Sequence, residues 1–361
     1  MSHSPSPSEH ALRKDEHVDL AVALHDPARR TGYDDVAFVH HALPGTSVAG
    51  SDLTTTVCGR TWAVPLYVNA MTGGTPRTAE LNAHLARAAA RAGLAIACGS
   101  QHVALRDPSR AESFTIIRRE APDAFVLANV GPTVEPQAAR QAVDMLEADA
   151  LQVHLNVAQE VVMPEGDRDF TGWFECLEAI VETVDVPVIV KEVGFGLSRH
   201  TLEQVRQVGA TAADVAGNGG TDFVTIERSR RPGGEFGYLT GWGQSAVLCL
   251  LTAQQPSSVG LELLASGGVR HPLDVLRALA LGARAVGVSG HFLRTLIGDG
   301  PQALDDELTG WIGELSSLMA LVGASDLESL RRTDLLITGD TAERARLMGV
   351  DPEALAHRSG T

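Results

Sequence analysis

The stretch ALQVHLNVAQEVVMPEGDRDF, residues 150–170, carries the clearest signal for the fold. It begins as an apolar run typical of a buried strand. Where that run stops it gathers a His, an Asn, a Gln, two Glu, two Asp and an Arg. Only 20% of the residues in the chain are charged, so this concentration of polar groups at the end of a strand indicates a functional site there.

Seven more apolar runs of this kind occur along the chain, and helical, alanine- and leucine-rich stretches follow most of the eight. With the first, they cover residues 64–70, 94–100, 124–130, 150–156, 186–192, 212–217, 261–267 and 283–290. Eight such units in about 230 residues predict a (β/α)8 TIM barrel, in which the carboxyl ends of the strands carry the site. A doubly wound open sheet has the same alternation, but no GxGxxG follows the first run.

The barrel core is predicted over about 61–300, inside a single domain that spans 12–361. Residues 1–60 are expected to form an N-terminal extension, with a disordered start at 1–11 that is rich in Ser and Pro. Residues 301–361 are expected to form a C-terminal helical tail that packs on the outside of the barrel.

The composition limits the function classes. A net charge of −16 argues against a nucleic-acid or anionic-membrane surface, although a local basic pocket remains compatible with it. The four cysteines form no CxxC pair, and no segment approaches the roughly 20 apolar residues that a membrane span needs. We therefore expect a cytoplasmic protein with reduced thiols that binds neither nucleic acid nor membrane.

Glycine-rich turns after the seventh and eighth runs predict a phosphate site. Gly267 and Gly268 allow close approach of the backbone, and Ser289 and Gly290 complete the cradle. The alternative is that these glycines only make tight turns. The segments NAMTGG (69–74) and AGNGGT (216–221) are similarly free of bulky side chains that would block a flat ligand.

Lys191 ends the apolar run VPVIV and is expected near the mouth of the barrel. Beside a bound flavin, such a lysine stabilises negative charge on the reduced ring. The alternative is a salt bridge with the neighbouring Glu192.

His154 and Asn156 share one side of a strand because their spacing is two, and Gln159 and Glu160 follow in the loop. A carboxylate at this position suits Mg²⁺, which prefers hard oxygen ligands and keeps substrate phosphates among them. The alternative is a solvated acidic loop in which residues 167–169 pair locally.

The basic run LRKDEH at 12–17 places Arg13, Lys14 and His17 together. Such a run is usually a solvated surface. In so acidic a protein it is also a candidate clamp for a diphosphate, ordered when substrate binds.

Together these segments resemble the type 2, FMN-dependent isopentenyl-diphosphate isomerases. The resemblance runs from about 12 to about 340, through RKDEH, AMTGG, GSQHVALRDP, HLNVAQEVVMPEGDRDF, VIVKEVGFGLS, AGNGGTDFVTIE and ASGGVRHPLDV. It implies interconversion of isopentenyl and dimethylallyl diphosphate in isoprenoid biosynthesis, with reduced FMN as the acid/base catalyst, NADPH as its reductant, Mg²⁺, and a homotetramer or homo-octamer.

The resemblance also implies roles for individual residues. FMN would be bound by Ala70, Met71, Thr72, Ser100, Asn129, Lys191, Thr221, Gly267, Gly268, Val269, Arg270, Ser289 and Gly290. The substrate would be bound by Arg13, Lys14, His17, Ser100, Gln101, His102, His154 and Gln159. Glu160 would coordinate the metal, and the catalytic residues would be Gln159, Lys191 and His154.

One position departs from the family pattern, which usually has Arg where this chain has His102. A histidine titrates near neutral pH, so substrate binding is expected to weaken above about pH 7. A KM that stays flat from acid to alkaline pH would contradict this.

Two other functions share the predicted architecture. An FMN-dependent hydroxy-acid oxidase or dehydrogenase would use the same barrel and phosphate loops, but it would need a His base and paired Arg residues near the last strands. The basic residues there, Arg270, His271 and His291, have no such spacing. A non-catalytic phosphate-binding barrel would be colourless and independent of Mg²⁺.

Overall fold

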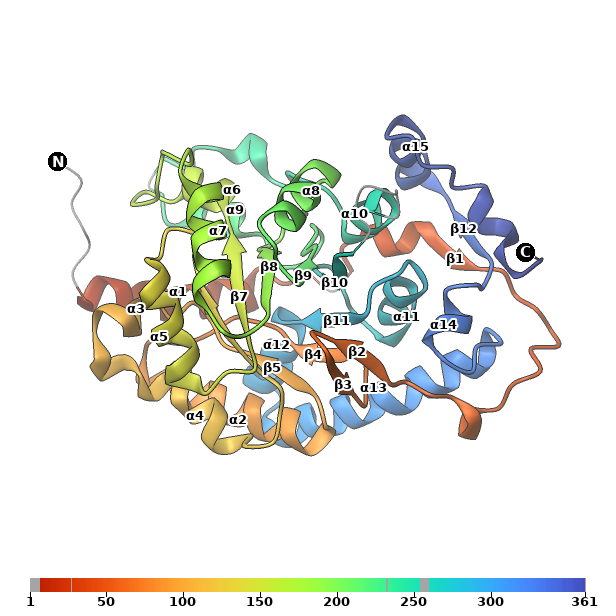
Figure 1. Cartoon of the computed structure of the whole chain (residues 1–361), viewed down its shortest axis with the longest axis horizontal. Helices are drawn as coiled ribbons and strands as arrows, with labels where there is room; N and C mark the ends of the chain where they lie inside the picture. Colours follow the sequence, from red (N-terminus) through yellow and green to blue (C-terminus); the bar gives the residue numbers. More distant parts are fainter. Residues whose placement is uncertain (1–6, 27, 232, 254–259, 361) are drawn as a thin grey trace.

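All eight apolar runs form parallel strands that close into a barrel (Figure 1). The structure is a computed structural model. It describes residues 7–26, 28–231, 233–253 and 260–360, without the side chains of 7–13 and 360. In spatial order, the barrel strands are β4 (Leu66–Val68), β5 (Ala95–Ala97), β6 (Val126–Val130), β7 (Ala150–Leu155), β8 (Val188–Glu192), β9 (Ala212–Asp214), β10 (Glu262–Ser266) and β11 (Ala285–Val288). Strand β11 pairs back onto β4, which confirms the predicted TIM barrel.

Helices connect successive strands and cover the outside of the barrel. They are α2 (Pro76–Ala92), α3 (His102–Arg106), α4 (Glu112–Glu120), α5 (Pro136–Leu146), α6 (Val157–Val162), α7 (Trp173–Thr183), α8 (Arg199–Gln207), α9 (Phe223–Ser229), α10 (Ala246–Ala253), α11 (Pro272–Ala280), α12 (Gly290–Gly298) and α13 (Pro301–Leu321).

Local sequence explains the ends of these helices. The first, α2, begins where the Thr75 side chain accepts the N–H of Thr78 in a capping box, with Pro76 in the first turn. It ends at Gly93, whose φ of 68° lies in the left-handed region that a glycine adopts at little cost.

A hairpin of β2 (Thr55–Val57) and β3 (Arg60–Trp62) closes the amino-terminal end of the barrel. Trp62 packs against Tyr67 and Phe125, with ring centroids 5.9 and 5.2 Å apart. Small residues such as Ala95 and Ala212 leave room for these rings inside the barrel. This end is therefore filled with apolar side chains, and the opposite end is left to form a site.

The N-terminal extension and the C-terminal tail meet on one side of the barrel. Strand β1 (Val36–Phe38) pairs antiparallel with β12 (Leu335–Ile337), beside α15 (Gly339–Leu347). The short helix α14 (Leu327–Leu330) precedes β12, and α13 packs outside the barrel against α2 and α11. The tail is largely helical, as predicted, and β12 is the exception, because the run DLLIT has an extended partner in β1.

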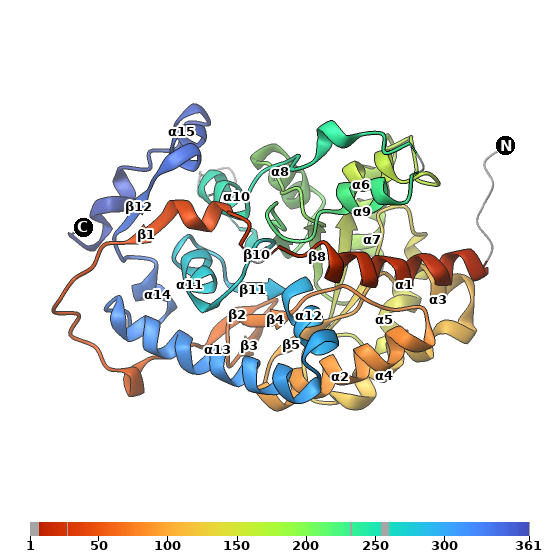
Figure 2. The ribbon, with the colours of Figure 1, turned by 180° about the vertical axis from the view of Figure 1, so that it is seen from behind.

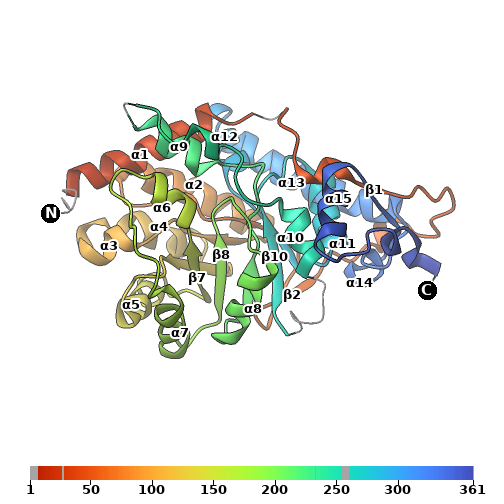
Figure 3. The same cartoon turned by 90° about the horizontal axis from the view of Figure 1, so that it is seen from above.

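Helix α1 (Pro7–Ala23) lies along the opposite end of the molecule, next to α9 and α12 (Figures 2 and 3). Of the segment 1–11 that was expected to be disordered, residues 1–6 lie outside the described residues. Residues 7–11 belong to α1, which corrects the expectation for that part. Pro7 suits the first turn of a helix, and no proline or glycine follows it before the helix ends.

Within the described ranges, the structure contains no helix of the length and apolar character that a membrane crossing requires.

Candidate active site

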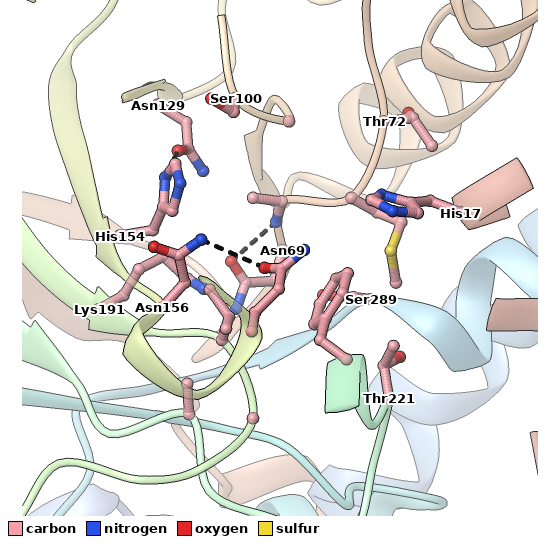
Figure 4. A pocket seen from close by; sticks show the side chains of 18 of the residues that line it. His17, Asn69, Thr72, Ser100, Asn129, His154, Asn156, Lys191, Thr221 and Ser289 are labelled. Atoms are coloured by element: carbon pink, nitrogen blue, oxygen red, sulfur yellow. Dashed lines mark hydrogen bonds between the residues drawn. The ribbon is translucent and has the colours of Figure 1, made fainter. Parts of the chain in front are cut away.

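A cavity of about 600 Å³ opens at the carboxyl ends of the barrel strands. Every barrel strand contributes to its lining at or just after its end, through Ala70, Ser100, Asn129, His154, Lys191, Ala216, Ser266 and Ser289. Helix α1 adds Lys14, His17 and Val18 from outside the barrel. Figure 4 shows His154, Asn156 and Lys191 on one side of the cavity, and Thr221, Ser289 and His17 on the other.

Most of the residues singled out from the sequence line this cavity. They are Lys14, His17, Ala70, Met71, Thr72, Ser100, His102, Asn129, His154, Gln159, Glu160, Lys191, Thr221, Gly267, Gly268, Val269, Ser289 and Gly290. Arg13 lies among the residues whose side chains are not described. Gln101 and Arg270 are not part of the lining.

Gln101, which was expected to bind the substrate, makes structural hydrogen bonds in the interior. Its side chain is fully buried, donates to the carbonyl of Ala142 (2.9 Å) and accepts the N–H of Asn129 (2.9 Å). It therefore fixes the end of β6 against α5. A side chain committed in this way does not face a ligand in the cavity.

Arg270 points away from the cavity into a group of carboxylates. Its guanidinium donates to both oxygens of Asp34 (2.7 and 3.0 Å) and to the fully buried Asp274 (3.0 Å). Its backbone N–H also donates to Asp274. Arg270 thus ties the loop after β10 to the N-terminal extension.

The glycine-rich side of the cavity has the shape of a close cradle. At Gly267 (φ +88°) an added Cβ would collide with the carbonyl oxygen of Gly217, and at Gly290 it would lie 2.9 Å from the Thr221 hydroxyl. A side chain at Gly267 would push the backbone of Gly217 away, and one at Gly290 would press on Thr221. Glycine at both positions therefore lets the loops lie close together around the cavity, where backbone N–H groups can meet a ligand phosphate.

Lys191 is buried beneath the mouth of the barrel. Its Nζ donates to the backbone carbonyl of Glu192 (2.7 Å), and it makes no salt bridge with the Glu192 carboxylate. That carboxylate instead accepts the N–H groups of Val193, Gly194 and Phe195 (2.7, 2.8 and 2.5 Å). The alternative of a Lys191–Glu192 salt bridge is therefore wrong.

The electrostatics of these two neighbours follow from their burial. Burial lowers the pKa of Lys191, while the charges of Asp214 and Glu192 act in the opposite direction. Burial raises the pKa of Glu192 to about 7, against the three N–H bonds to its carboxylate. The cavity thus contains a lysine whose charge is poorly solvated and available to an anionic ligand.

Gln159 is oriented by a residue that the sequence analysis did not assign a role. Its Nε2 donates to the carboxylate of Glu227 (2.9 Å), and its Oε1 accepts from Asn156 (3.3 Å). Glu227 is fully buried and lies 3.0 Å from His17 Nε2 and 2.6 Å from Arg230 Nη1. Glu227 therefore joins α1, α6 and α9 around the cavity.

The ionisation of Glu227 is strongly stabilised. Burial alone would raise its pKa, but hydrogen bonding with His17 and the His17 charge, followed by Gln159 and Arg230, lower it to about 2. The signal in the sequence was an acidic residue at the end of the apolar run FVTI in α9, where a charge needs buried partners.

Glu160 is held at the rim by two hydrogen bonds. Asn156 Nδ2 and the N–H of Asp167 each donate to its carboxylate at 2.8 Å. Arg168 donates to the backbone carbonyls of Met163, Glu160 and Gly166. The polar loop therefore wraps around Glu160. The alternative, in which Arg168 pairs with Asp167 and Asp169, is not what the structure shows, because the Arg168 guanidinium donates to backbone carbonyls.

Among the described side chains, no group of three or more His, Cys, Asp or Glu is placed to hold a metal ion. A cation at Glu160 would need ligand or water oxygens to complete its coordination, as Mg²⁺ bound to phosphates does.

Comparison with known proteins gives long matches at high identity. The chain is 49% identical to isopentenyl-diphosphate delta-isomerase of Streptomyces sp. (strain CL190) over 97% of its length and 96% of that relative. It is 52% identical to the enzyme of the same name from Kitasatospora griseola, with the same coverage. The chain belongs to the isopentenyl-diphosphate delta-isomerase family.

A second finding gives the class of isopentenyl-diphosphate delta-isomerase. The model of the FMN-dependent dehydrogenase family matches residues 118–337, which include the end of β6, Lys191 and both glycine-rich loops. The chain is therefore an isopentenyl-diphosphate delta-isomerase family member of the type 2, FMN-dependent class.

Solved structures confirm the fold of this isomerase family member. Mandelate oxidase in complex with (S)-2-phenylpropionate has a TM-score of 0.64, at 19% identity over 93% of this chain and 99% of that one. Mandelate oxidase with 3,3-difluoro-2-hydroxy-3-phenylpropionic acid has a TM-score of 0.62, at 18% identity over 90% of this chain and 91% of that one. At such identities the likeness concerns the barrel alone, so it gives no support for a hydroxy-acid oxidase activity.

One more cation lines the cavity of this isomerase family member, beyond those expected from the sequence. Arg106, at the end of α3, lies four residues after His102 and therefore on the same helix face. The adjacent carboxylate of Asp107 is already engaged by Ser109 (2.6 Å) and Arg110 (3.3 Å). Arg106 and Asp107 both line the cavity, and the partners of the Asp107 carboxylate are Ser109 and Arg110.

Proposed function

We propose that the chain interconverts isopentenyl diphosphate and dimethylallyl diphosphate in isoprenoid biosynthesis, with FMN and Mg²⁺ bound at the carboxyl end of the barrel. The observation that carries the proposal is one cavity that combines a glycine cradle, a buried lysine and several basic side chains. It lies in a chain that is about half identical to named isomerases over nearly its full length.

FMN fits the glycine-lined half of the cavity. Its phosphate would meet the backbone N–H groups at 267–269 and 289–290, and its ring would pass Ala70, Met71 and Thr72 towards Lys191. Reduced FMN, when bound, supplies the acid and base chemistry of the double-bond shift. Lys191 would stabilise negative charge beside it, because burial leaves this ammonium group few other anionic partners.

The diphosphate fits the opposite half, where basic side chains from separate elements converge. Lys14 and His17 come from α1, His102 and Arg106 from α3, and His154 from β7. Arg13 and Ser100 are proposed to contribute as well. Basic side chains on three elements can contact both phosphates, and those of α1 would hold this helix against the cavity when substrate is bound.

Glu160 is the proposed Mg²⁺ ligand. Its carboxylate lies in the cavity lining and is oriented by Asn156 and by the N–H of Asp167. One protein carboxylate together with phosphate oxygens is a common environment for this ion.

Gln159 is proposed to position the hydrocarbon part of the substrate. Both ends of its amide are engaged, by Glu227 and by Asn156, so the side chain cannot rotate freely. A fixed amide beside the alkene holds the reacting carbons in one orientation, which lowers the entropic cost of reaching the geometry for proton transfer.

NADPH as the reductant, a cytoplasmic location and a homotetramer or homo-octamer are part of the same proposal. The exposed aromatic residues Tyr238 and Trp242, on the segment between α9 and α10, support an interface between subunits because aromatic side chains are enriched at such surfaces.

The test uses purified protein reconstituted with FMN. Its visible spectrum is recorded, and it is then incubated without oxygen with NADPH, Mg²⁺ and isopentenyl diphosphate while formation of dimethylallyl diphosphate is followed. Isomerisation that requires reduced FMN supports the proposal. Flavin binding without isomerisation, tested with hydroxy acids in parallel, would favour the oxidase function, and a protein that binds no flavin would refute both.

A further inference from the structure

A chain of polar side chains crosses the interior of the barrel and links the end of β9 with the end of β7. It starts at Asp214, which is fully buried. The Asp214 carboxylate accepts hydrogen bonds from the Tyr67 hydroxyl (2.8 Å), Asn69 Nδ2 (2.9 Å), the Ser266 hydroxyl (2.8 Å) and the N–H of Ala216 (3.1 Å). An ionised carboxylate only accepts, and these four donors satisfy it.

Two fixed partners determine which way the Asn69 amide points. Its Nδ2 must face the acceptor Asp214, and its Oδ1 must face the N–H of Ala70, a backbone donor 2.8 Å away. The next side chain, Gln152, therefore presents its Nε2 to Asn69 Oδ1 (3.3 Å). The direction of donation is set by the carboxylate at one end and a peptide N–H beside it.

The same direction continues to the histidine. Gln152 Oε1 accepts from Asn129 Nδ2 (3.4 Å), so Asn129 Oδ1 is left to face His154 Nδ1 at 2.8 Å. His154 must then carry its proton on Nδ1. Its other nitrogen, Nε2, lies on the side of Gly131, a residue of the cavity wall, and offers a lone pair.

The charges around His154 keep the ring neutral before substrate binds. Burial is the largest cause that lowers its pKa to about 3, and the positive charges of Lys191 (β8), Lys14 (α1) and His102 (α3) follow. The carbonyl of Val130 acts in the opposite direction. At neutral pH the Nε2 atom of His154 is therefore a hydrogen-bond acceptor, and the proposed substrate places its negatively charged diphosphate beside it.

We propose that Asp214, Asn69, Gln152 and Asn129 are positioning residues that fix His154 with its proton on Nδ1, so that binding of the diphosphate takes up one proton. An ionised diphosphate oxygen is an acceptor, and Nε2 is an acceptor, so the two can meet only with a proton between them. That proton comes from solvent, and no other bond is made or broken. The inference rests on the proposed function for the identity of the ligand.

The test is calorimetric titration of the FMN-loaded protein with isopentenyl diphosphate at pH 7 and saturating Mg²⁺, with the flavin oxidised so that no turnover occurs. The heat is measured in buffers of different ionisation enthalpy, and its slope gives the protons taken up. Free diphosphate is almost fully ionised at this pH, since the last phosphate pKa is about 6. We expect an uptake of roughly half to one proton per site.

Variants assign the proton to His154 and test the amide chain. His154→Gln should lose most of the uptake, any remainder being that of His102, and the matched control His200→Gln, an exposed residue of α8 outside the cavity lining, should retain all of it. Gln152→Leu should reduce it, because Asn129 can then turn and let Nε2 carry the proton beforehand. Where that buried variant does not fold, Asn129→Asp serves the same purpose: a carboxylate at Nδ1 charges the ring before substrate binds, and uptake falls towards zero.

The outcomes separate this inference from the proposed function. Binding and isomerisation with heats that do not depend on the buffer would overturn the inference and leave the function intact. Undiminished uptake in His154→Gln would overturn it too. Uptake lost in His154→Gln but unchanged in both chain variants would overturn the positioning role of the amides. Absence of any binding would instead refute the proposed function.

Discussion

Glu227→Gln tests whether the buried carboxylate behind Gln159 holds the site together. The substitution keeps the shape and one acceptor oxygen, so the hydrogen bond from Gln159 Nε2 can persist. It removes the negative charge that faces His17 at 3.0 Å and Arg230 at 2.6 Å. Arg230 keeps Glu165 (2.9 Å) and Glu16 (3.4 Å) as partners, so its own charge stays compensated.

The magnitude follows from the ionisation of Glu227. Its pKa falls from 4.5 to about 2 in the folded protein. At 1.36 kcal/mol per pKa unit, the ionised form is favoured in the folded state by about 3 kcal/mol. The folded pKa is depressed, so this stabilisation is fully present above about pH 4.5 and is lost as the pH falls through 2. Roughly half of it remains at pH 3.

The assay is denaturant unfolding at pH 7, repeated at lower pH. We expect Glu227→Gln to lower the free energy of unfolding by ~2–3 kcal/mol at pH 7, with a smaller difference from wild type towards pH 3. Glu112→Gln is the matched control, since its carboxylate pairs with Arg119 at 2.8 Å on an exposed surface and should change stability by less than about 0.5 kcal/mol. Equal stability of Glu227→Gln and wild type at pH 7 would refute the reasoning.

Three further predictions concern the cavity. Arg106→Ala should raise the KM for isopentenyl diphosphate by roughly 10-fold with little change in kcat, whereas Arg110→Ala, which loses only its bond to Asp107, should not; equal KM values for both would contradict the assignment. Gln159→Ala should lower turnover more than diphosphate affinity, and Glu160→Ala should chiefly raise the Mg²⁺ concentration needed for half-maximal rate; the reverse pattern in steady-state kinetics would sink both roles. Gly267→Ala should weaken FMN binding in a fluorescence titration, since the added methyl group meets the backbone of the neighbouring loop, and unchanged FMN affinity would exclude a phosphate cradle there.

Much of the barrel and of the site was predictable from the sequence because the relevant signals are local. The eight apolar runs fall on the eight barrel strands, and the residues that end them meet at one rim because parallel strands align their carboxyl ends. That rule placed His154, Lys191 and Ser289 in one cavity although they are far apart in the chain. The glycine-rich turns were recognisable for a similar reason, because close backbone approach requires glycine at fixed positions.

The sequence predictions that the structure did not support share a different cause. Gln101 and Arg270 lie within recognisable motifs, yet the Gln101 side chain faces a helix carbonyl and the Arg270 side chain faces Asp274, four residues later, and Asp34, 236 residues earlier. Strand β12 exists because β1 lies beside it, about 300 residues earlier in the chain. Each outcome depends on which partner the folded chain brings within hydrogen-bonding distance, and spacing along the sequence does not contain that information.

The sequence by itself determined the architecture, the end of the barrel that carries the site, and the residue types gathered there, because periodicity and turn chemistry act over a few residues. Only the tertiary structure decided the direction in which each polar group points. It turned the Glu192 carboxylate onto three backbone N–H groups, placed Glu227 behind Gln159 and ordered the amides between Asp214 and His154. The physical reason is that a buried donor or acceptor must find a partner, and closure of the barrel determines which partners are within reach.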